Sequence, residues 1–325
     1  GHKVNAIDTP GFAGDLNLGY ETVWNTFIEQ VIKAPEKKNP KLVNIFGIVP
    51  YHDPFWSGTL EELDRILSKL GLTVNTFFTK QQGLEAVEHC AEAALNIIVN
   101  PWLFKGPAKK FEEKFAVPSL RFPFAPIGAT DTSAFVRAVA EKLSLDRELT
   151  QRVIDEEESY VYRYLAQAIG VLSWKRFAVA GDASSAIAIT RYLANDYSFT
   201  PVLVIITEPI FRPEDKERII KAVTELEYAE APRVVFASDQ WEINQAVKNE
   251  PKFITPQSPR ASMTIRTAKL PSRTPFSVSR SLLQRASARS SASTAAKAMS
   301  ATVLHSTNSA FTSSMWSCSS GRKHT

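Results

Sequence analysis

The chain has 325 residues, 44% of them hydrophobic, which is enough for about two domains with cores of their own. Its net charge of +4 is unevenly distributed, because residues 1–255 contain 28 basic and 34 acidic side chains, whereas residues 256–325 contain ten basic side chains and no acidic one. A basic protein often binds nucleic acid, but the body of this chain is acidic, so no nucleic-acid partner is expected.

The cysteines and the apolar runs indicate the compartment. Cys90 and Cys318 lie on opposite sides of the change in composition, so a disulfide framework is not expected and a reducing compartment is favoured. No apolar run approaches the roughly 18 residues of a membrane span, and no signal peptide opens the chain. We therefore expect a cytoplasmic protein with no membrane partner. The chain begins at Gly1 rather than at methionine, which predicts that an N-terminal part is missing.

The first predicted domain covers residues 41–146, where short β-branched runs alternate with helical patterns. Its predicted strands are residues 42–49, 73–78, 95–99 and 119–122. Between the first two runs, Leu60, Leu63 and Leu67 recur at helical spacing. This alternation is typical of a parallel sheet covered by helices, so we predict a Rossmann-like domain.

A long connecting helix is predicted over residues 147–170, with an apolar stripe that includes Ile154, Val161 and Leu165. A second, incomplete Rossmann-like domain is predicted over residues 171–255, on the same plan as the first. Its predicted strands are residues 177–180, 202–207, 234–237 and 253–255. The predicted fold class is therefore α/β, with two Rossmann-like parallel-sheet domains joined by a long helix.

The tail, residues 256–325, has a different composition. It contains 18 serines and only nine Leu, Ile, Val or Phe residues in 70 positions. That is too little large apolar surface to offset the entropy of an ordered chain, so one expectation is a disordered Ser/Arg-rich tail. The alternative is a frameshift, because the composition changes at Thr255, where the second sheet is expected to continue.

Codon arithmetic supports the frameshift hypothesis. Residues 299–308, read two bases later with four-fold serine codons, permit Val-Gly-Tyr-Gly-Ala-Ala-Leu-Tyr-Glu, and residues 275–280 permit Phe-Leu-Ser-Phe-Pro. Both products are typical of a folded α/β protein. Sequencing the gene across the codon for Thr255 would distinguish an out-of-frame tail from a disordered one.

The residues themselves predict no catalytic group and no metal ligand. No Gly-x-Gly-x-x-Gly follows a strand and no P-loop lysine is present. The turn Gly181–Ser185 precedes a helix and could bind an anion, but a helix N-cap is the favoured interpretation. The five histidines have no metal-ligand spacing, and Cys90 is predicted to be a small buried residue rather than a ligand.

Five segments carry a family resemblance through their order and spacing over residues 4–255. They are Asp8–Gly14 followed by Gly19 and Tyr20, Leu95–Trp102, Pro126–Gly128 with Thr132 and Phe135, Trp174–Ala178 with Gly181 and Asp182, and Ser238–Trp241. Together they resemble the nitrogenase component 1 family, specifically its β-type subunits. That family has three Rossmann-like domains per subunit, which implies that residues 1–40 are the remnant of a first domain and a connecting helix. The shifted-frame Val-Gly-Tyr-Gly also resembles the C-terminal pattern of the family.

The resemblance implies a reductive function. In the family, α-type and β-type subunits form a heterotetramer, an iron–sulfur P-cluster lies at their interface, and an ATP-dependent iron protein delivers electrons. The cysteines that hold the cluster belong to the first domain, so this chain is expected to bind no cofactor alone. Gly11 and Phe12 are the residues that the resemblance places in the cluster-adjacent turn. Catalytic β subunits carry a serine there that can approach the cluster, and Gly11 cannot act as a ligand.

The β-type assignment depends on Asn100. In α-type subunits a cofactor-binding cysteine follows the strand that here ends Val99-Asn100, and an asparagine is not a ligand of that kind. The leading hypothesis is a fragment of a β-type subunit of a nitrogenase-like reductase, not catalytic alone. The alternatives are a scaffold for cofactor assembly and, from a different class, a two-lobed module that binds a small ligand. Neighbouring genes for an α-type partner or for biosynthetic proteins would discriminate the first two.

Overall fold

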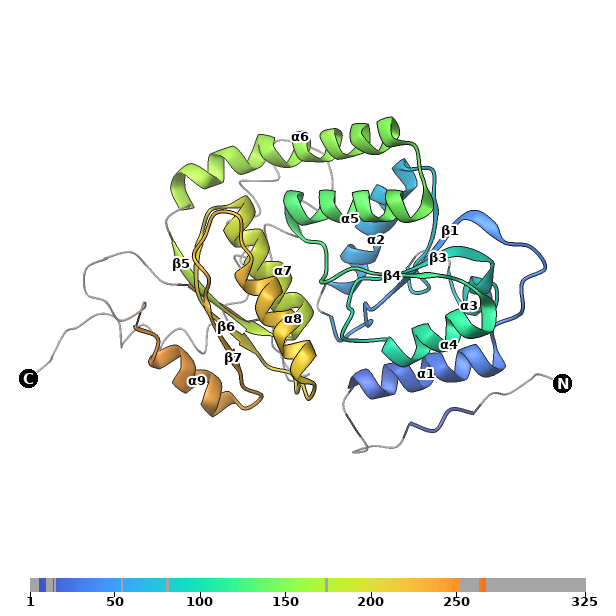
Figure 1. The fold of residues 1–325 in the computed structure, drawn as a ribbon, viewed down its shortest axis with the longest axis horizontal. Helices are drawn as coiled ribbons and strands as arrows, with labels where there is room; N and C mark the ends of the chain where they lie inside the picture. Colours follow the sequence, from blue (N-terminus) through green and yellow to red (C-terminus); the bar gives the residue numbers. More distant parts are fainter. Residues whose placement is uncertain are drawn as a thin grey trace, which may run out of the picture.

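The computed structural model describes residues 6–9, 14, 16–53, 55–79, 82–172, 175–251 and 263–266, with the backbone alone for 166–172 and 263–266. Two α/β units lie side by side, and helix α6 (Arg147–Leu172) runs along both (Figure 1). The predicted fold class is confirmed, with two parallel sheets and a long helix between them in the chain.

The first sheet is parallel and has the strand order β2-β1-β3-β4. Its strands are β1 (Asn39–Phe46), β2 (Thr73–Asn75), β3 (Ala93–Ile98) and β4 (Ser119–Arg121). The helices on one face are α1 (Leu16–Gln30), α3 (Leu84–Glu88), the 3-10 turn Cys90–Glu92 and α4 (Lys105–Phe115). Those on the other are α2 (Trp56–Lys69) and α5 (Gly128–Leu143), below α6 in Figure 1. A sheet covered on both faces explains the continuous apolar runs of the sequence.

Helix α1 is fixed to this sheet by an aromatic cluster around Trp24. The Trp24 side chain is almost fully buried and meets the rings of Phe46 at 4.8 Å, Phe77 at 4.9 Å and Phe104 at 5.7 Å between centroids. These rings come from β1, from the loop after β2 and from the turn before α4. Edge-to-face contacts of this kind add about 0.5–1.5 kcal/mol each beyond the burial of apolar area.

Three asparagines form a buried row across the middle of the same sheet. Asn44 on β1 is in register with Asn75 on β2 and with Asn96 on β3. The Asn44 amide donates to Oδ1 of Asn96 (2.8 Å) and to the carbonyl of Cys90 (2.9 Å), and its Oδ1 accepts from Nδ2 of Asn75 (3.2 Å). The Nδ2 of Asn96 has no hydrogen-bond partner among the described residues, but a slip of one residue would break all three bonds, so the row specifies the register.

The second sheet is also parallel, with the order β7-β6-β5-β8. Its strands are β5 (Arg176–Gly181), β6 (Thr200–Ile206), β7 (Arg233–Phe236) and β8 (Met263–Arg266). Helices α7 (Ala183–Arg191) and α8 (Pro213–Thr224) cover the face toward the first domain, whereas α9 (Gln240–Lys248) covers the other face (Figure 1). Between α7 and β6 the chain forms a π-helical turn, Tyr192–Asp196.

The two domains share one apolar core. Phe135 of α5 and Ile187 of α7 belong to the same buried cluster, which continues through Phe177 of β5 and Val43 of β1. The inner faces of both sheets therefore contribute to a single hydrophobic interior rather than to two separate ones.

Strand β8 differs from the expectation for the tail. Its four residues lie within 256–325, where the composition predicts no regular structure, yet their backbone pairs in parallel with Phe177–Ala180 of β5. The β-branched Thr264 and Ile265 favour an extended chain, and the edge of β5 offers unpaired backbone groups to it. The strand predicted at 253–255 lies outside the described residues, as does the rest of the tail.

Candidate functional site

The described site is the crevice where the carboxyl ends of the two sheets meet. Gly11 and Phe12, the cluster-adjacent residues expected from the resemblance, lie outside the described residues. In α/β proteins ligands bind at the carboxyl ends of strands, where the strand order reverses. Here the order reverses between β1 and β3 in the first sheet and between β5 and β8 in the second.

At the first reversal, Gly47 and Asn100 are in close contact. Gly47 directly follows the last residue of β1 and has a φ of 94°. A Cβ built on it would lie 2.7 Å from the backbone nitrogen of Asn100. Only glycine fits this conformation and this space. The Asn100 side chain accepts a hydrogen bond from the N–H of Trp102 (3.2 Å), and its carbonyl accepts from Leu103 (3.1 Å). Asn100 therefore shapes the turn after β3.

At the second reversal, the turn Gly181–Ser185 is a helix N-cap, as favoured from the sequence. The Asp182 carboxylate accepts the N–H of Ser185 at 2.9 Å. The Glu208 carboxylate, in the loop after β6, accepts a hydrogen bond from the N–H of Ala183 at 3.0 Å. Because two carboxylates occupy these donors at the start of α7, the turn is not arranged to hold an anion.

Ser184 joins the two ends of the crevice. Its Oγ accepts the N–H of Ala125 (3.1 Å) and donates to the carbonyl of Val99 (3.4 Å), so it bonds two loops of the first domain. Nearby, Asp53 accepts the N–H of Phe55 at 2.9 Å in the turn before α2. Burial raises the pKa of Asp53 to about 6, the bond from Phe55 lowers it, and the Asp182 carboxylate raises it further.

The second domain also caps a helix of the first. Asp196, in the π-helical turn, accepts hydrogen bonds from the N–H of Ala129 (2.7 Å) and from the N–H (3.3 Å) and hydroxyl (2.6 Å) of Thr130, in the first turn of α5. Gly128 begins α5 with a φ of 85°, and a Cβ there would collide with Asp196 and with the ring of Tyr192. The Pro126–Gly128 segment of the resemblance is therefore part of the domain contact.

Two ion pairs cross between the domains. Arg191 on α7 forms a bidentate pair with the buried Asp131 on α5 at 2.9 Å, while its Nη1 donates to the carbonyl of Glu225 (2.9 Å) at the end of α8. Lys105 at the start of α4 bonds Asp215 on α8 at 2.7 Å. Together with Ser184 and Asp196 described above, these pairs fix the relative position of the domains.

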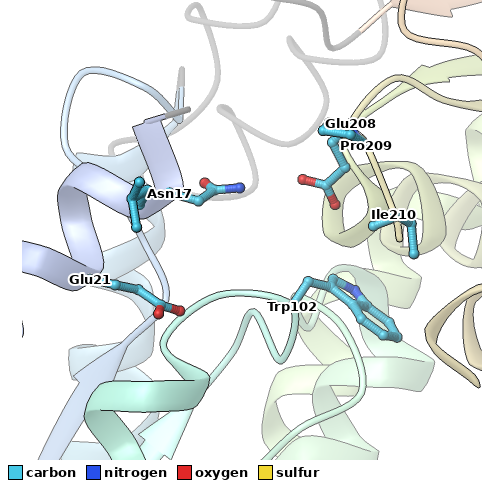
Figure 2. A pocket seen from close by; sticks show the side chains of 7 residues that line it. Asn17, Glu21, Trp102, Glu208, Pro209 and Ile210 are labelled. Atoms are coloured by element: carbon cyan, nitrogen blue, oxygen red, sulfur yellow. The ribbon is translucent and has the colours of Figure 1, made fainter. Parts of the chain in front are cut away.

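A small cavity lies beside this contact. It has a volume of about 260 Å³, and its lining residues are Asn17, Leu18, Glu21, Trp102, Glu208, Pro209 and Ile210. Figure 2 shows the side chains of Asn17 and Glu208 reaching toward each other across the opening, with Glu21 and Trp102 below. The cavity is slightly smaller than typical small-molecule pockets of roughly 300–1,000 Å³. Its polar lining consists mainly of carboxylate and amide oxygens and assembles no nucleophile with a base.

Metal-ligating side chains are dispersed in the described part of the chain. No group of three or more His, Cys, Asp or Glu residues is arranged there to hold a metal ion. Cys90 is buried on the turn before β3, as predicted, and burial raises the pKa of its thiol. His89 is exposed, with Nδ1 at 2.9 Å from a carboxylate oxygen of Glu92. Among the helices that the structure describes, none is long and apolar enough to cross a membrane.

Sequence reasoning did not identify Asp53 or Glu208 as residues of the crevice, or Asp196 as the cap of α5. Each lies in a loop or turn next to an element that the sequence predicts. Their interaction partners in other parts of the chain, however, become apparent only in the folded structure. Glu208 came with a weak signal, because it is an acidic residue two positions after a buried strand, at the carboxyl edge of the sheet.

Comparison with known proteins gives a family. The family model of nitrogenase component 1 type oxidoreductases matches residues 1–257. The match ends two residues after Thr255, where the composition changes. The chain of nitrogenase Cp1 solved at pH 6.5 has the same fold, with a TM-score of 0.59 and 19% identity over 80% of this chain and 60% of that one.

Three curated relatives have different roles. The nitrogenase iron-molybdenum cofactor biosynthesis protein NifE of Rhodobacter capsulatus is 29% identical over 54% of this chain and 35% of its own length. The nitrogenase molybdenum-iron protein beta chain of Methanococcus maripaludis is 25% identical over 59% of this chain and 44% of its own. A subunit of the light-independent protochlorophyllide reductase of Methylobacterium sp. (strain 4-46) is 29% identical over 61% of this chain and 39% of its own.

The chain thus spans less than half the length of each of these three relatives, which are a cofactor biosynthesis protein, a nitrogenase beta chain and a protochlorophyllide reductase subunit. The family match nevertheless covers most of the chain and both described domains. On this basis the chain belongs to the nitrogenase component 1 type oxidoreductase family.

Proposed function

We propose that this chain is part of a β-type subunit of a nitrogenase-like reductase, which bears no catalytic cofactor and is not catalytic alone. It supports the placement of an iron–sulfur P-cluster, pairs with an α-type subunit, and receives electrons from an ATP-dependent iron protein. Gly11 and Phe12 belong to the turn beside the cluster in this proposal. Its location is the cytoplasm.

The main support for the proposal is the residue type and the hydrogen bonding of Asn100. The position after β3 is where an α-type subunit has its cofactor-binding cysteine, and here it is an asparagine whose side chain bonds the N–H of Trp102. An amide committed to a backbone turn supplies no thiolate to a metal. The close contact with Gly47 leaves no room between the ends of β1 and β3. These features support a β-type role.

A cofactor-assembly scaffold is the second candidate, and the similarity to a NifE protein favours it. The family is the same, and the difference is whether the bound metal cluster is used for reduction or passed on. The third candidate, a two-lobed ligand-binding module, is disfavoured, because such lobes need a movable boundary. Here one apolar core and the Arg191–Asp131 pair cross the boundary.

The test is anaerobic co-expression of the complete gene product with an α-type subunit of the family. A β-type subunit gives a stable complex with that subunit, and the complex contains iron and oxidises reductant only when ATP and the iron protein are added. A complex without iron contradicts the proposal. The matched control is each subunit purified alone, for which no ATP-dependent oxidation is expected.

The same preparation separates the two family roles. A scaffold holds its cluster without ATP-dependent oxidation of reductant and transfers metal to a cofactor-free reductase when the two are mixed. Metal retained by the complex during that mixing supports the reductase, and metal transferred supports the scaffold.

A further inference from the structure

Two acidic side chains line one small cavity from different domains. Of its seven described lining residues, Glu21 and Glu208 are acidic and none is basic. Glu21 comes from α1 in the first domain, and Glu208 comes from the loop after β6 in the second (Figure 2). Because the ion pairs that cross the domain boundary fix both walls, the cavity is preformed, as ligand sites usually are.

Each of the two carboxylates is oriented by a backbone N–H group. An oxygen of Glu21 accepts the N–H of Lys105 at 3.1 Å, and an oxygen of Glu208 accepts the N–H of Ala183 at 3.0 Å. These amide donors are neutral, so they hold the carboxylates in place without cancelling their charge.

Two basic residues near the cavity bind other groups. The Lys105 ammonium is paired with Asp215 at 2.7 Å. The Arg121 guanidinium attracts Glu21 electrostatically, but it donates its hydrogen bonds to the carbonyls of Phe104 and Lys105, both at 3.3 Å. Arg121 therefore offsets part of one negative charge, and the cavity as a whole stays negative, which favours a cation.

The lining also contains a buried hydrogen-bond donor. The Nε1 of Trp102 is buried and has no hydrogen-bond partner in the part of the chain that the structure describes. A buried N–H without a partner is unfavourable, so an acceptor on a ligand would stabilise it. Leu18, Pro209 and Ile210 add apolar surface to the lining. Since the described side chains form no group of three metal-ligating residues, an organic cation fits this cavity better than a bare metal ion.

We propose that this cavity binds a small primary amine that also carries a carbonyl or hydroxyl oxygen. The ammonium group lies between Glu21 and Glu208, where its three N–H groups bond carboxylate oxygens. The ligand oxygen accepts from the indole N–H of Trp102. The volume of about 260 Å³ restricts the ligand to a molecule smaller than most drug-sized compounds. Because this binding needs no metal cluster, it is testable whether or not the proposed function holds.

The experiment is an NMR titration of the 325-residue chain with glycinamide, followed through the indole N–H signals of the tryptophans. The signal that is missing in Trp102→Phe belongs to Trp102, and it is expected to shift and to saturate. Propionamide has the same shape without the charge and should bind at least about tenfold more weakly, because charge-assisted hydrogen bonds are lost. Isobutylamine keeps the charge but has no acceptor and should bind about fivefold more weakly. Equal affinity for all three probes, or a shift that does not saturate, overturns the proposal.

Variants of the two carboxylates test the cation contacts. Glu21→Gln and Glu208→Gln keep an oxygen for the N–H groups of Lys105 and Ala183, so the backbone bonds can persist. Each is expected to weaken glycinamide binding about tenfold. The matched control is Glu113→Gln, because Glu113 is exposed on α4 and does not line the cavity. Unchanged affinity in both cavity variants, or an equal loss in the control, overturns the proposal.

The same titrations in Trp102→Phe test the acceptor contact. Glycinamide binding is expected to weaken about fivefold, whereas isobutylamine binding is expected to stay the same, because isobutylamine has no oxygen to bond the indole. An equal loss for both amines would show that only packing has changed and overturns the role of the indole. If Trp102→Phe does not fold, the amide signal of Lys105, which donates to Glu21, reports binding of the three probes instead.

Discussion

Replacing Asp196 by alanine tests whether the second domain supplies the cap of a helix in the first. Asp196 is buried and accepts three hydrogen bonds from Ala129 and Thr130, at the start of α5. The substitution removes both acceptor oxygens, and with them all three hydrogen bonds, together with a negative charge at the positive end of the helix dipole. It leaves the apolar surface of the π-helical turn largely intact.

The size of the effect follows from these bonds. Loss of an N-cap costs about 1–2 kcal/mol. A buried donor left unpaired adds about 1–3 kcal/mol, and the N–H of Ala129 is such a donor because its 2.7 Å bond to Asp196 is buried. We expect Asp196→Ala to lower the free energy of unfolding by roughly 2–4 kcal/mol. Asp196→Asn keeps an acceptor but loses the charge, so a smaller loss is expected.

The assay is urea unfolding followed by tryptophan fluorescence, with Asp239→Ala as the matched control. Asp239 also caps a helix through two backbone N–H groups, but within its own domain and at the surface. Its loss should cost only about 1 kcal/mol. Thr130→Val completes a double-mutant cycle with Asp196→Ala, for which a coupling of at least about 0.5 kcal/mol is expected. Equal losses for Asp196→Ala and Asp239→Ala, with no coupling, would refute the reasoning.

Three further predictions use the same measurement. Gly47→Ala should lower the free energy of unfolding by about 1–3 kcal/mol, because alanine is strained at a φ of 94°. Gly58→Ala, in an open position on α2, should instead raise it by up to about 1 kcal/mol. Equal effects of the two substitutions would contradict the role of Gly47. Asn44→Ala should cost roughly 2–4 kcal/mol, because it leaves buried partners unpaired, and a loss below about 1 kcal/mol would show that the row is dispensable. Arg191→Lys should cost about 1–3 kcal/mol, since an ammonium cannot reproduce the bidentate pair with Asp131; an unchanged urea midpoint would count against that pair.

The alternation of strands and helices was predictable from the sequence because the central strands, such as β5 and β6, are buried over most of their length. β6 illustrates this, since Pro201 to Ile206 are all buried and read as one apolar run. The long helix was predicted at 147–170 and is observed as Arg147–Leu172, because its apolar stripe keeps helical spacing.

Strand ends were less predictable. The first strand was expected to reach Val49 but ends at Phe46, because Gly47 turns the chain with a positive φ. The strand expected at 73–78 ends at Asn75, and Phe77 has a φ of 65°. Apolar residues continue past both ends because they pack in the core from loops. An apolar run therefore records burial, not the extent of the strand.

The crevice was not predictable for a different reason. Asp53 and Asp182 belong to different domains, and nothing near either residue specifies the other. The position of α1 shows the same limit, because the resemblance implies a connecting helix within residues 1–40 but not that Trp24 packs among Phe46, Phe77 and Phe104. Such pairings depend on how whole sheets face each other.

The cap on α5 also has a consequence for synthesis on the ribosome. Asp196 follows Ala129 by 67 residues, so the first turn of α5 leaves the ribosome well before its cap exists. Until the π-helical turn emerges, the buried donors of that helix have only water as a partner. Folding of the first domain should therefore reach completion only after β5 and α7 have been translated, and a pause in translation before Asp196 would prolong an uncapped, aggregation-prone intermediate.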